Sequence, residues 1–158
     1  MTVKEFFSDP GSATLSFKQI APQANYGLEV LYQQLDNTGS VRLVKISIDD
    51  LPVLLGLSQA NLSSPTFVDI LENSGVIPIG VKLFAKDSGI IRKSLQIDQI
   101  RVGEISNHLI KEQLINQGYD SELLMYARTS LFTKNDEVMT LIEYALPGLE
   151  QLLNNLEG

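Results

Sequence analysis

The chain has 158 residues, is 44% hydrophobic and carries a formal net charge of −7, which favours a single domain spanning residues 1–158 around one sizeable core. It has no cysteine and one histidine, so disulfides and thiolate metal sites are excluded and we expect no metal. Scattered basic residues, no bilayer-length apolar run and no signal-peptide pattern predict a cytoplasmic protein with neither nucleic acid nor membrane as partner.

The first half of the chain predicts extended segments separated by turns. Alternation of apolar and polar residues predicts strands over 14–20 and 41–48, and the tight turn at 49–52 predicts that 53–60 returns as the hairpin partner of 41–48. The segment 26–35 fits a short helix or a strand. The first ten residues are too weakly patterned to predict an element.

Helix signals lie in the middle of the chain and at its end. Ser64 before Pro65 is a typical helix start, and Asn73-Ser74-Gly75 is a typical end. Ser106 is expected to cap a second helix that ends before Gly118. The final helix is amphipathic, and its stripe consists of Leu149, Leu152, Leu153 and Leu156.

The second half also contains strands. An extended segment is expected over about 90–102, and two long strands over 124–133 and 137–146 flank a hairpin turn. Hairpin-connected strands with helices inserted between them imply an antiparallel β-sheet with helices packed on one side. The expected fold class is therefore α+β.

Two charged residues lie where the strand pattern places apolar side chains. Because side chains alternate between the faces of a strand, Arg42 shares a face with Val44, and Glu143 shares one with Leu141. A charge on an apolar face costs roughly several kcal/mol unless it is paired or hydrogen-bonded. Arg42 and Glu143 either pair with each other or meet a polar ligand in a pocket. Arg128 could instead partner Glu143 across the final hairpin.

The segment 75–84 resembles a known signature. It matches the pattern G-x-x-P-L-G-x-x-L-F of chorismate pyruvate-lyases at Gly75, Pro78, Gly80, Leu83 and Phe84, with Ile79 as a conservative replacement. The strand of Arg42 resembles the arginine-bearing strand of that family, and Glu143, shortly before Pro147, resembles the glutamate of its last strand. The resemblance extends from about Thr14 to Pro147.

This resemblance implies a chorismate lyase-like fold, with the ligand enclosed beside the sheet under flaps. It also implies an enzyme that eliminates pyruvate from chorismate to give 4-hydroxybenzoate, with no cofactor, or a protein that binds a related aromatic acid. Arg42 would bind the ring carboxylate, and Glu143 would face the ring hydroxyl and relay the ring proton. The backbone at Ile79 and Gly80 would contact the ligand, and Arg128 would add positive charge.

The same fold resembles the effector-sensing domain of GntR-type transcription regulators, which bind small ligands without turning them over. The sequence thus leaves open a lyase, a non-catalytic sensor and an interaction protein with a closed pocket. The expected partner in the first two cases is a small aromatic carboxylate. The leucines at 149–156 form either a core contact or the contact of a homodimer.

Overall fold

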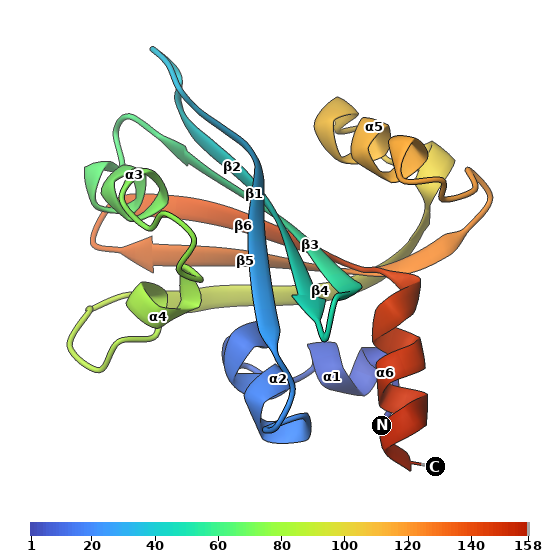
Figure 1. Ribbon diagram of the computed structural model, residues 1–158. Helices are drawn as coiled ribbons and strands as arrows, with labels where there is room; N and C mark the ends of the chain where they lie inside the picture. Colours follow the sequence, from blue (N-terminus) through green and yellow to red (C-terminus); the bar gives the residue numbers. More distant parts are fainter. Residues whose placement is uncertain (158) are drawn as a thin grey trace.

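A computed structural model describes residues 1–157, and over this range six strands form one open antiparallel sheet (Figure 1). The order across the sheet is β1-β2-β3-β6-β5-β4. The strands are β1 (Tyr26–Leu35), β2 (Gly39–Ile48), β3 (Leu51–Asn61), β4 (Ile91–Arg101), β5 (Leu124–Lys134) and β6 (Glu137–Ala145). The predicted hairpins β2–β3 and β5–β6 are both confirmed, and the ambiguous segment 26–35 is a strand.

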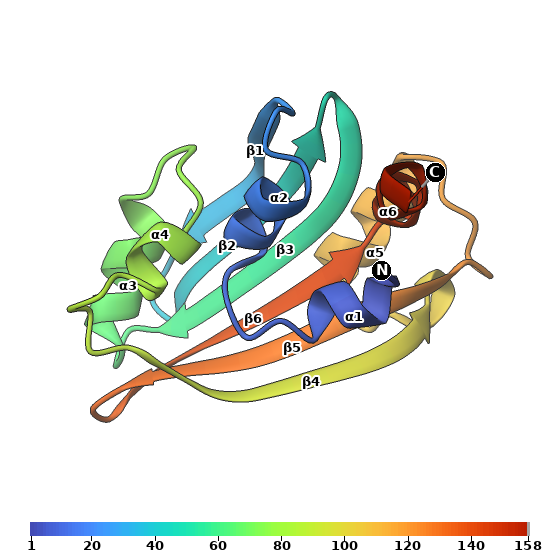
Figure 2. The same ribbon diagram turned by 90° about the horizontal axis from the view of Figure 1, so that it is seen from below.

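Helices cover both faces of the sheet. They are α1 (Val3–Phe7), α2 (Ala13–Ile20), α3 (Pro65–Glu72), α4 (Gly80–Leu83), α5 (His108–Asn116) and α6 (Pro147–Glu157), with a short 3-10 turn η1 (Val102–Glu104). The expected antiparallel α+β sheet is confirmed, and α1, α2, α3, α4 and α6 pack on one face. On the opposite face Ile110 and Leu114 of α5 pack with Leu43 and Leu55 (Figures 1 and 2). None of these helices is long and apolar enough to cross a membrane.

The N-terminal segment differs from the expected structure. Residues 14–20 lie in helix α2 instead of a strand, because Ser12 caps this helix by accepting a hydrogen bond from the Leu15 backbone N–H. Phe17 is buried while Leu15 is 54% exposed, so the two side chains do not share the inward face that a strand would give them. Residues 3–7 also form a helix, which buries Phe6 and Phe7.

The helix expected to follow Ser106 begins one residue later. The Asn107 side chain is the cap and accepts from the Ile110 backbone N–H at 3.2 Å. Ile105 and Ile110 are both buried in the cluster beneath α5. The helix ends before Gly118, whose φ of 88° suits the left-handed region that a glycine tolerates.

Helix α3 is fixed to the sheet by residues of β6. Pro65 is at its first turn, as predicted, but Ser64 makes no cap hydrogen bond within the helix. The Ser64 hydroxyl instead accepts from the Val138 backbone N–H at 2.8 Å. The Glu137 carboxylate provides the cap, since it accepts from the Thr66 backbone N–H and hydroxyl, both at 2.6 Å. The loop after α3 therefore starts from an anchored helix.

Candidate functional site

A cavity lies between the sheet and its cover of helices. Its floor comes from β2, β3 and β6, and its cover comes from the start of α2 and from residues 78–84. Apolar groups dominate the lining, but Arg42, Arg92 and Glu143 all contribute to it. The space open to the centres of water-sized molecules is about 60 Å³, enough for a few waters.

Arg42 faces the cavity from β2 and holds the loop between α3 and α4. The side chain is 2% exposed. Its Nη1 donates to the Gly75 carbonyl at 2.8 Å and its Nη2 to the Ile77 carbonyl at 3.1 Å. Burial lowers the pKa of Arg42 below its ordinary value, and the charge of Glu72 partly opposes this. Among the side chains described, those of residues 1–156, no carboxylate lies within ion-pair distance of Arg42.

Glu143 pairs with Arg128 and not with Arg42. The two residues are direct cross-strand partners on β5 and β6. Arg128 Nε donates to Oε1 of Glu143 at 2.8 Å, and Nη2 donates to Oε2 at 3.0 Å. Glu143 is only 4% exposed. This is the cross-hairpin pairing that the sequence left open, and it is a bidentate buried ion pair.

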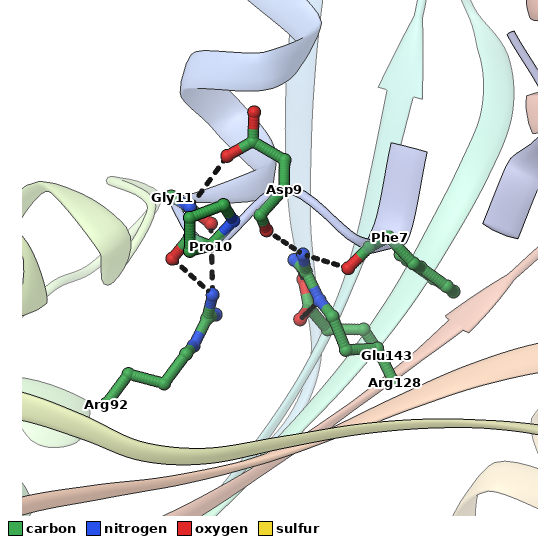
Figure 3. A network of polar contacts seen from close by, with 7 residues as sticks. All are labelled: Phe7, Asp9, Pro10, Gly11, Arg92, Arg128 and Glu143. Carbon is green, nitrogen blue, oxygen red and sulfur yellow. Dashed lines mark hydrogen bonds and ion pairs between the residues drawn. The ribbon is translucent and has the colours of Figure 1, made fainter. Parts of the chain in front are cut away.

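Arg128 also holds the chain segment that precedes α2. Residues 7–11, which we call the strap, pass over the side chains of Arg128 and Arg92 (Figure 3). Arg128 Nη1 donates to the carbonyls of Phe7 at 3.2 Å and Asp9 at 3.1 Å. The Phe7 ring centroid lies 5.1 Å from the guanidinium carbon of Arg128. The strap is thus bound by charge-assisted hydrogen bonds from below.

Arg92, on β4, is a site residue that the sequence patterns did not identify. Its Nη1 donates to the carbonyls of Pro10 at 2.6 Å and Gly11 at 3.2 Å. Its guanidinium carbon lies 5.1 Å from the ring centroid of Phe84 and 5.0 Å from that of Phe132. Its Nε is buried and has no hydrogen-bond partner among the described residues. Burial and then the charge of Arg128 lower the pKa of Arg92 to about 10 against the opposing carboxylates.

A bulge explains why strand alternation missed Arg92. Leu95 and Ile97 are the cross-strand partners of Ser130 and Arg128 and share their face. Regular alternation would continue that face to Lys93. The register shifts between Arg92 and Ser94, however, and this places Arg92 on the cavity face.

The loop residues named by the sequence resemblance line the cover of the cavity. Ile79 and Gly80 are both lining residues. A Cβ at position 80 would lie 2.8 Å from the Ser12 Cβ, so the start of α4 meets the start of α2 at a distance that only glycine permits without a shift. The geometry brings Arg42, Ile79, Gly80 and Glu143 to one cavity, whereas Arg128 lies behind Glu143. Ligand contact by these residues stays a prediction.

Tyr26, at the start of β1, supports the cavity wall and yields a pH prediction. Its hydroxyl lies 2.9 Å from that of Thr14, which lines the cavity. Burial raises the pKa of Tyr26 above its ordinary value of about 10. As the pH rises, the Tyr26 phenol therefore ionises in the unfolded chain before it ionises in the folded one. The contribution of the protonated phenol to the stability of the fold is full below about pH 10 and is lost as the pH rises through the pKa of the folded state.

The measurement compares the wild type with Tyr26→Phe in urea unfolding between about pH 9 and about pH 11. The free energy of unfolding of the wild type relative to the variant should fall as the pH rises. A difference that does not change with pH would contradict the raised pKa of Tyr26.

Within the described part of the chain, no group of His, Cys, Asp or Glu is arranged to hold a metal ion.

No protein-family model matches the sequence, and no curated protein matches it.

Several solved structures share the fold at low sequence identity. PhnF from Mycobacterium smegmatis superposes with a TM-score of 0.62, at 12% identity, over 89% of this chain and 65% of that one. The effector domain of PhnF alone superposes with a TM-score of 0.57 at 13% identity, over 87% of this chain and 89% of that domain.

Two further structures give similar values. The C-terminal domain of the histidine utilization repressor from Pseudomonas syringae pv. tomato gives 0.55 at 9% identity, over 78% of this chain and 92% of that domain. A GntR-family transcriptional regulator from Bacillus cereus gives a TM-score of 0.52 at 11% identity, over 77% of this chain and 92% of that one. The fold is therefore that of the effector-binding domains of such regulators. Membership in the chorismate pyruvate-lyase family is not confirmed.

Proposed function

We propose that this protein is a non-catalytic sensor domain, spanning residues 1–158, that binds a small organic anion in the cavity between the sheet and its cover. The observation that carries the proposal is an excess of positive charge. Arg42 and Arg92 both line the cavity, and neither has a carboxylate partner among the side chains of residues 1–156. The one lining carboxylate, Glu143, is already neutralised by Arg128.

A carboxylate is the chemistry that these groups favour. An arginine presents a planar fork of donors that matches a carboxylate, and the interaction strengthens where water is excluded. The remaining lining is largely apolar and includes Leu141 and Leu83. An aromatic or other apolar body with an acidic group fits this combination, with Arg42 as the proposed carboxylate ligand and the backbone at Ile79 and Gly80 as contacts.

The geometry does not favour elimination of pyruvate from chorismate. That reaction would use Glu143 to relay the ring proton. Both oxygens of Glu143 instead accept hydrogen bonds from Arg128. A carboxylate whose two oxygens both accept from a guanidinium in this way is not positioned to take a proton from a ligand. The fold that this chain shares with regulator effector domains also supports binding without turnover.

Thermal unfolding with paired ligands tests the proposal. We expect 4-hydroxybenzoate and benzoate to raise the melting temperature, whereas the neutral 4-hydroxybenzamide and benzamide should not. A ligand at about 100 times its Kd adds about 2.7 kcal/mol to the free energy of unfolding. Incubation with chorismate should yield no 4-hydroxybenzoate absorbance. Shifts of equal size with acids and amides, or steady product formation, would contradict the proposal.

Filling the cavity from its floor should remove binding and leave the fold intact. A Cβ at Gly56 would lie 3.6 Å from Val44 Cγ2 and 3.9 Å from Leu141 Cδ1, which is ordinary contact. Gly56→Val therefore fits the strand and places a branched side chain in the cavity. We expect ligand affinity to fall roughly tenfold or more, with the free energy of unfolding changed by less than about 1 kcal/mol.

Gly27→Val is the matched control for Gly56→Val. Gly27 is an exposed strand glycine on β1, and a Cβ there would have only the Ser47 carbonyl oxygen within 4 Å. This variant should bind the acids as the wild type does. Equal losses of affinity in both variants would place the ligand elsewhere.

A further inference from the structure

Arg92 and Arg128 bind the strap in the same way. Each uses Nη1 to donate to two strap carbonyls, Arg128 to those of Phe7 and Asp9, and Arg92 to those of Pro10 and Gly11 (Figure 3). Both guanidinium groups also lie against aromatic rings. The two side chains therefore provide an internal comparison of how this protein satisfies a guanidinium on the cavity face of its sheet.

The two guanidinium groups differ at the edge formed by Nε and Nη2, which faces away from the strap carbonyls. In Arg128 the edge formed by Nε and Nη2 carries the two oxygens of the Glu143 carboxylate. In Arg92 neither of these atoms donates to any described residue, and Nε is buried without a partner. A buried donor left without an acceptor costs free energy, and native structures rarely contain one without a functional reason.

We infer that the Nε and Nη2 edge of Arg92 is a subsite for a carboxylate of the ligand, held in the same bidentate arrangement as Glu143 on Arg128. This inference rests on the proposed function, because it identifies a second anionic group on the molecule bound in that cavity. Arg42 serves the first group from the opposite side, since β2 and β4 are separated by β3, β6 and β5. The ligand class is therefore an organic dicarboxylate with an apolar centre.

Charge balance supports two carboxylates. Arg42, Arg92 and Arg128 together carry three positive charges beside the cavity. Among the side chains of residues 1–156 Glu143 is the only carboxylate within ion-pair distance of these arginines, while Glu72 and Asp9 act on Arg42 and Arg92 from farther away. A dicarboxylate neutralises the remaining two charges. Buried charges in proteins are generally balanced in this way.

Access to the subsite is through Phe84. Its ring lies beside the Arg92 guanidinium, and the residue is 41% exposed at the end of the four-residue helix α4. A rotamer change of one partly exposed ring is the kind of adjustment that ligand binding commonly brings about. The Phe132 ring, which is buried, stays as the inner wall of the subsite.

The test compares benzoate with phthalate, isophthalate and terephthalate by calorimetric titration. The three diacids share a ring and differ only in the separation of their carboxylates, so they measure the span between the two guanidinium groups. We expect at least one diacid to bind roughly tenfold more tightly than benzoate. In Arg92→Met this ratio should fall to about one, and the ratio is the readout because the loss of a positive charge from the cavity lowers the affinity for every acid.

Two further variants distinguish the bidentate Nε and Nη2 edge of Arg92 from the effect of its positive charge alone and from its hydrogen bonds to the strap. Arg92→Lys keeps the positive charge but cannot form the bidentate edge, so it should also lose the preference for diacids. Arg101→Met removes a half-exposed arginine from the same strand, paired with Glu122 at 3.8 Å, and should keep the preference. A loosened strap would change all affinities together and leave their ratio unchanged.

The outcomes are distinct. Tighter binding of a diacid that depends on Arg92 supports the subsite. If benzoate and all three diacids bind equally well, or if Arg92→Lys keeps the full preference, the bidentate subsite is overturned and the proposed anion sensor stands. If neither benzoate nor any diacid binds, both proposals fail.

Discussion

Replacing Glu143 with leucine is expected to lower the free energy of unfolding by about 3–5 kcal/mol. The substitution leaves the buried Arg128 guanidinium without its bidentate partner, with Nε and Nη2 facing an apolar group. Removing one member of a buried pair exposes the full cost of the remaining charge. Urea unfolding followed by circular dichroism measures the change.

The control for this prediction is the exposed glutamate on the edge strand. Glu29 pairs with Lys45 at 3.3 Å, and its side chain is well exposed. Glu29→Leu should therefore change the free energy of unfolding by no more than about 1 kcal/mol. Similar effects for Glu29→Leu and Glu143→Leu would show that the buried pair does not contribute as proposed.

A double replacement makes the prediction sharper. Arg128→Met together with Glu143→Leu removes both charges and leaves no uncompensated ion. This variant should be more stable than Glu143→Leu alone, although it loses the hydrogen bonds to the carbonyls of Phe7 and Asp9. If Glu143 acted in proton transfer and not in support of the fold, the single variant would retain wild-type stability.

Replacing Arg42 with methionine is expected to release the loop between α3 and α4. The change removes the hydrogen bonds from Nη1 to the Gly75 carbonyl and from Nη2 to the Ile77 carbonyl. Each such bond from a charged donor contributes about 1.5–3 kcal/mol, so amide exchange at Ile77 should accelerate roughly tenfold or more. Hydrogen exchange measured by NMR reports this opening directly.

Lys82→Met is the control for the loop. Lys82 Nζ donates to the Asn73 carbonyl at 3.2 Å in an exposed position of the same loop region. Loss of this bond should change exchange at Ile77 very little, because water replaces an exposed donor readily. If Arg42→Met and Lys82→Met had the same small effect, Arg42 would not hold the loop.

The two predictions address different parts of the site. Glu143 belongs to the floor and is paired with Arg128 behind it, while Arg42 joins the floor to a cover segment through neutral backbone acceptors. An anionic ligand that reaches Arg42 would compete with the Gly75 and Ile77 carbonyls for the same donors. Binding of an anion is therefore expected to change the exchange rate at Ile77 in the wild type and to have less effect in Arg42→Met.

Short-range patterns determined much of the sheet. The inward positions of Arg42 and Glu143 followed from strand parity alone, because successive side chains on a strand point to opposite faces. The hairpin turn between β5 and β6 sets their register, so the pairing of Arg128 with Glu143 was within reach of the sequence. Segment 14–20 was predicted wrongly, because two apolar residues, Leu15 and Phe17, are too few to establish the period of a strand, and the Ser12 cap starts a helix in which only Phe17 is buried.

The acceptors of the buried arginines were decided only by tertiary structure. Arg42 donates to carbonyls 33 and 35 residues away, and Arg128 to carbonyls about 120 residues away in sequence. A backbone carbonyl carries no residue-specific signal, so no side-chain pattern can identify it as the acceptor. Arg92 needed, in addition, a bulge that reverses strand parity. Local stereochemistry thus places a charge on a face, and only the packing of distant segments above that face determines its partner.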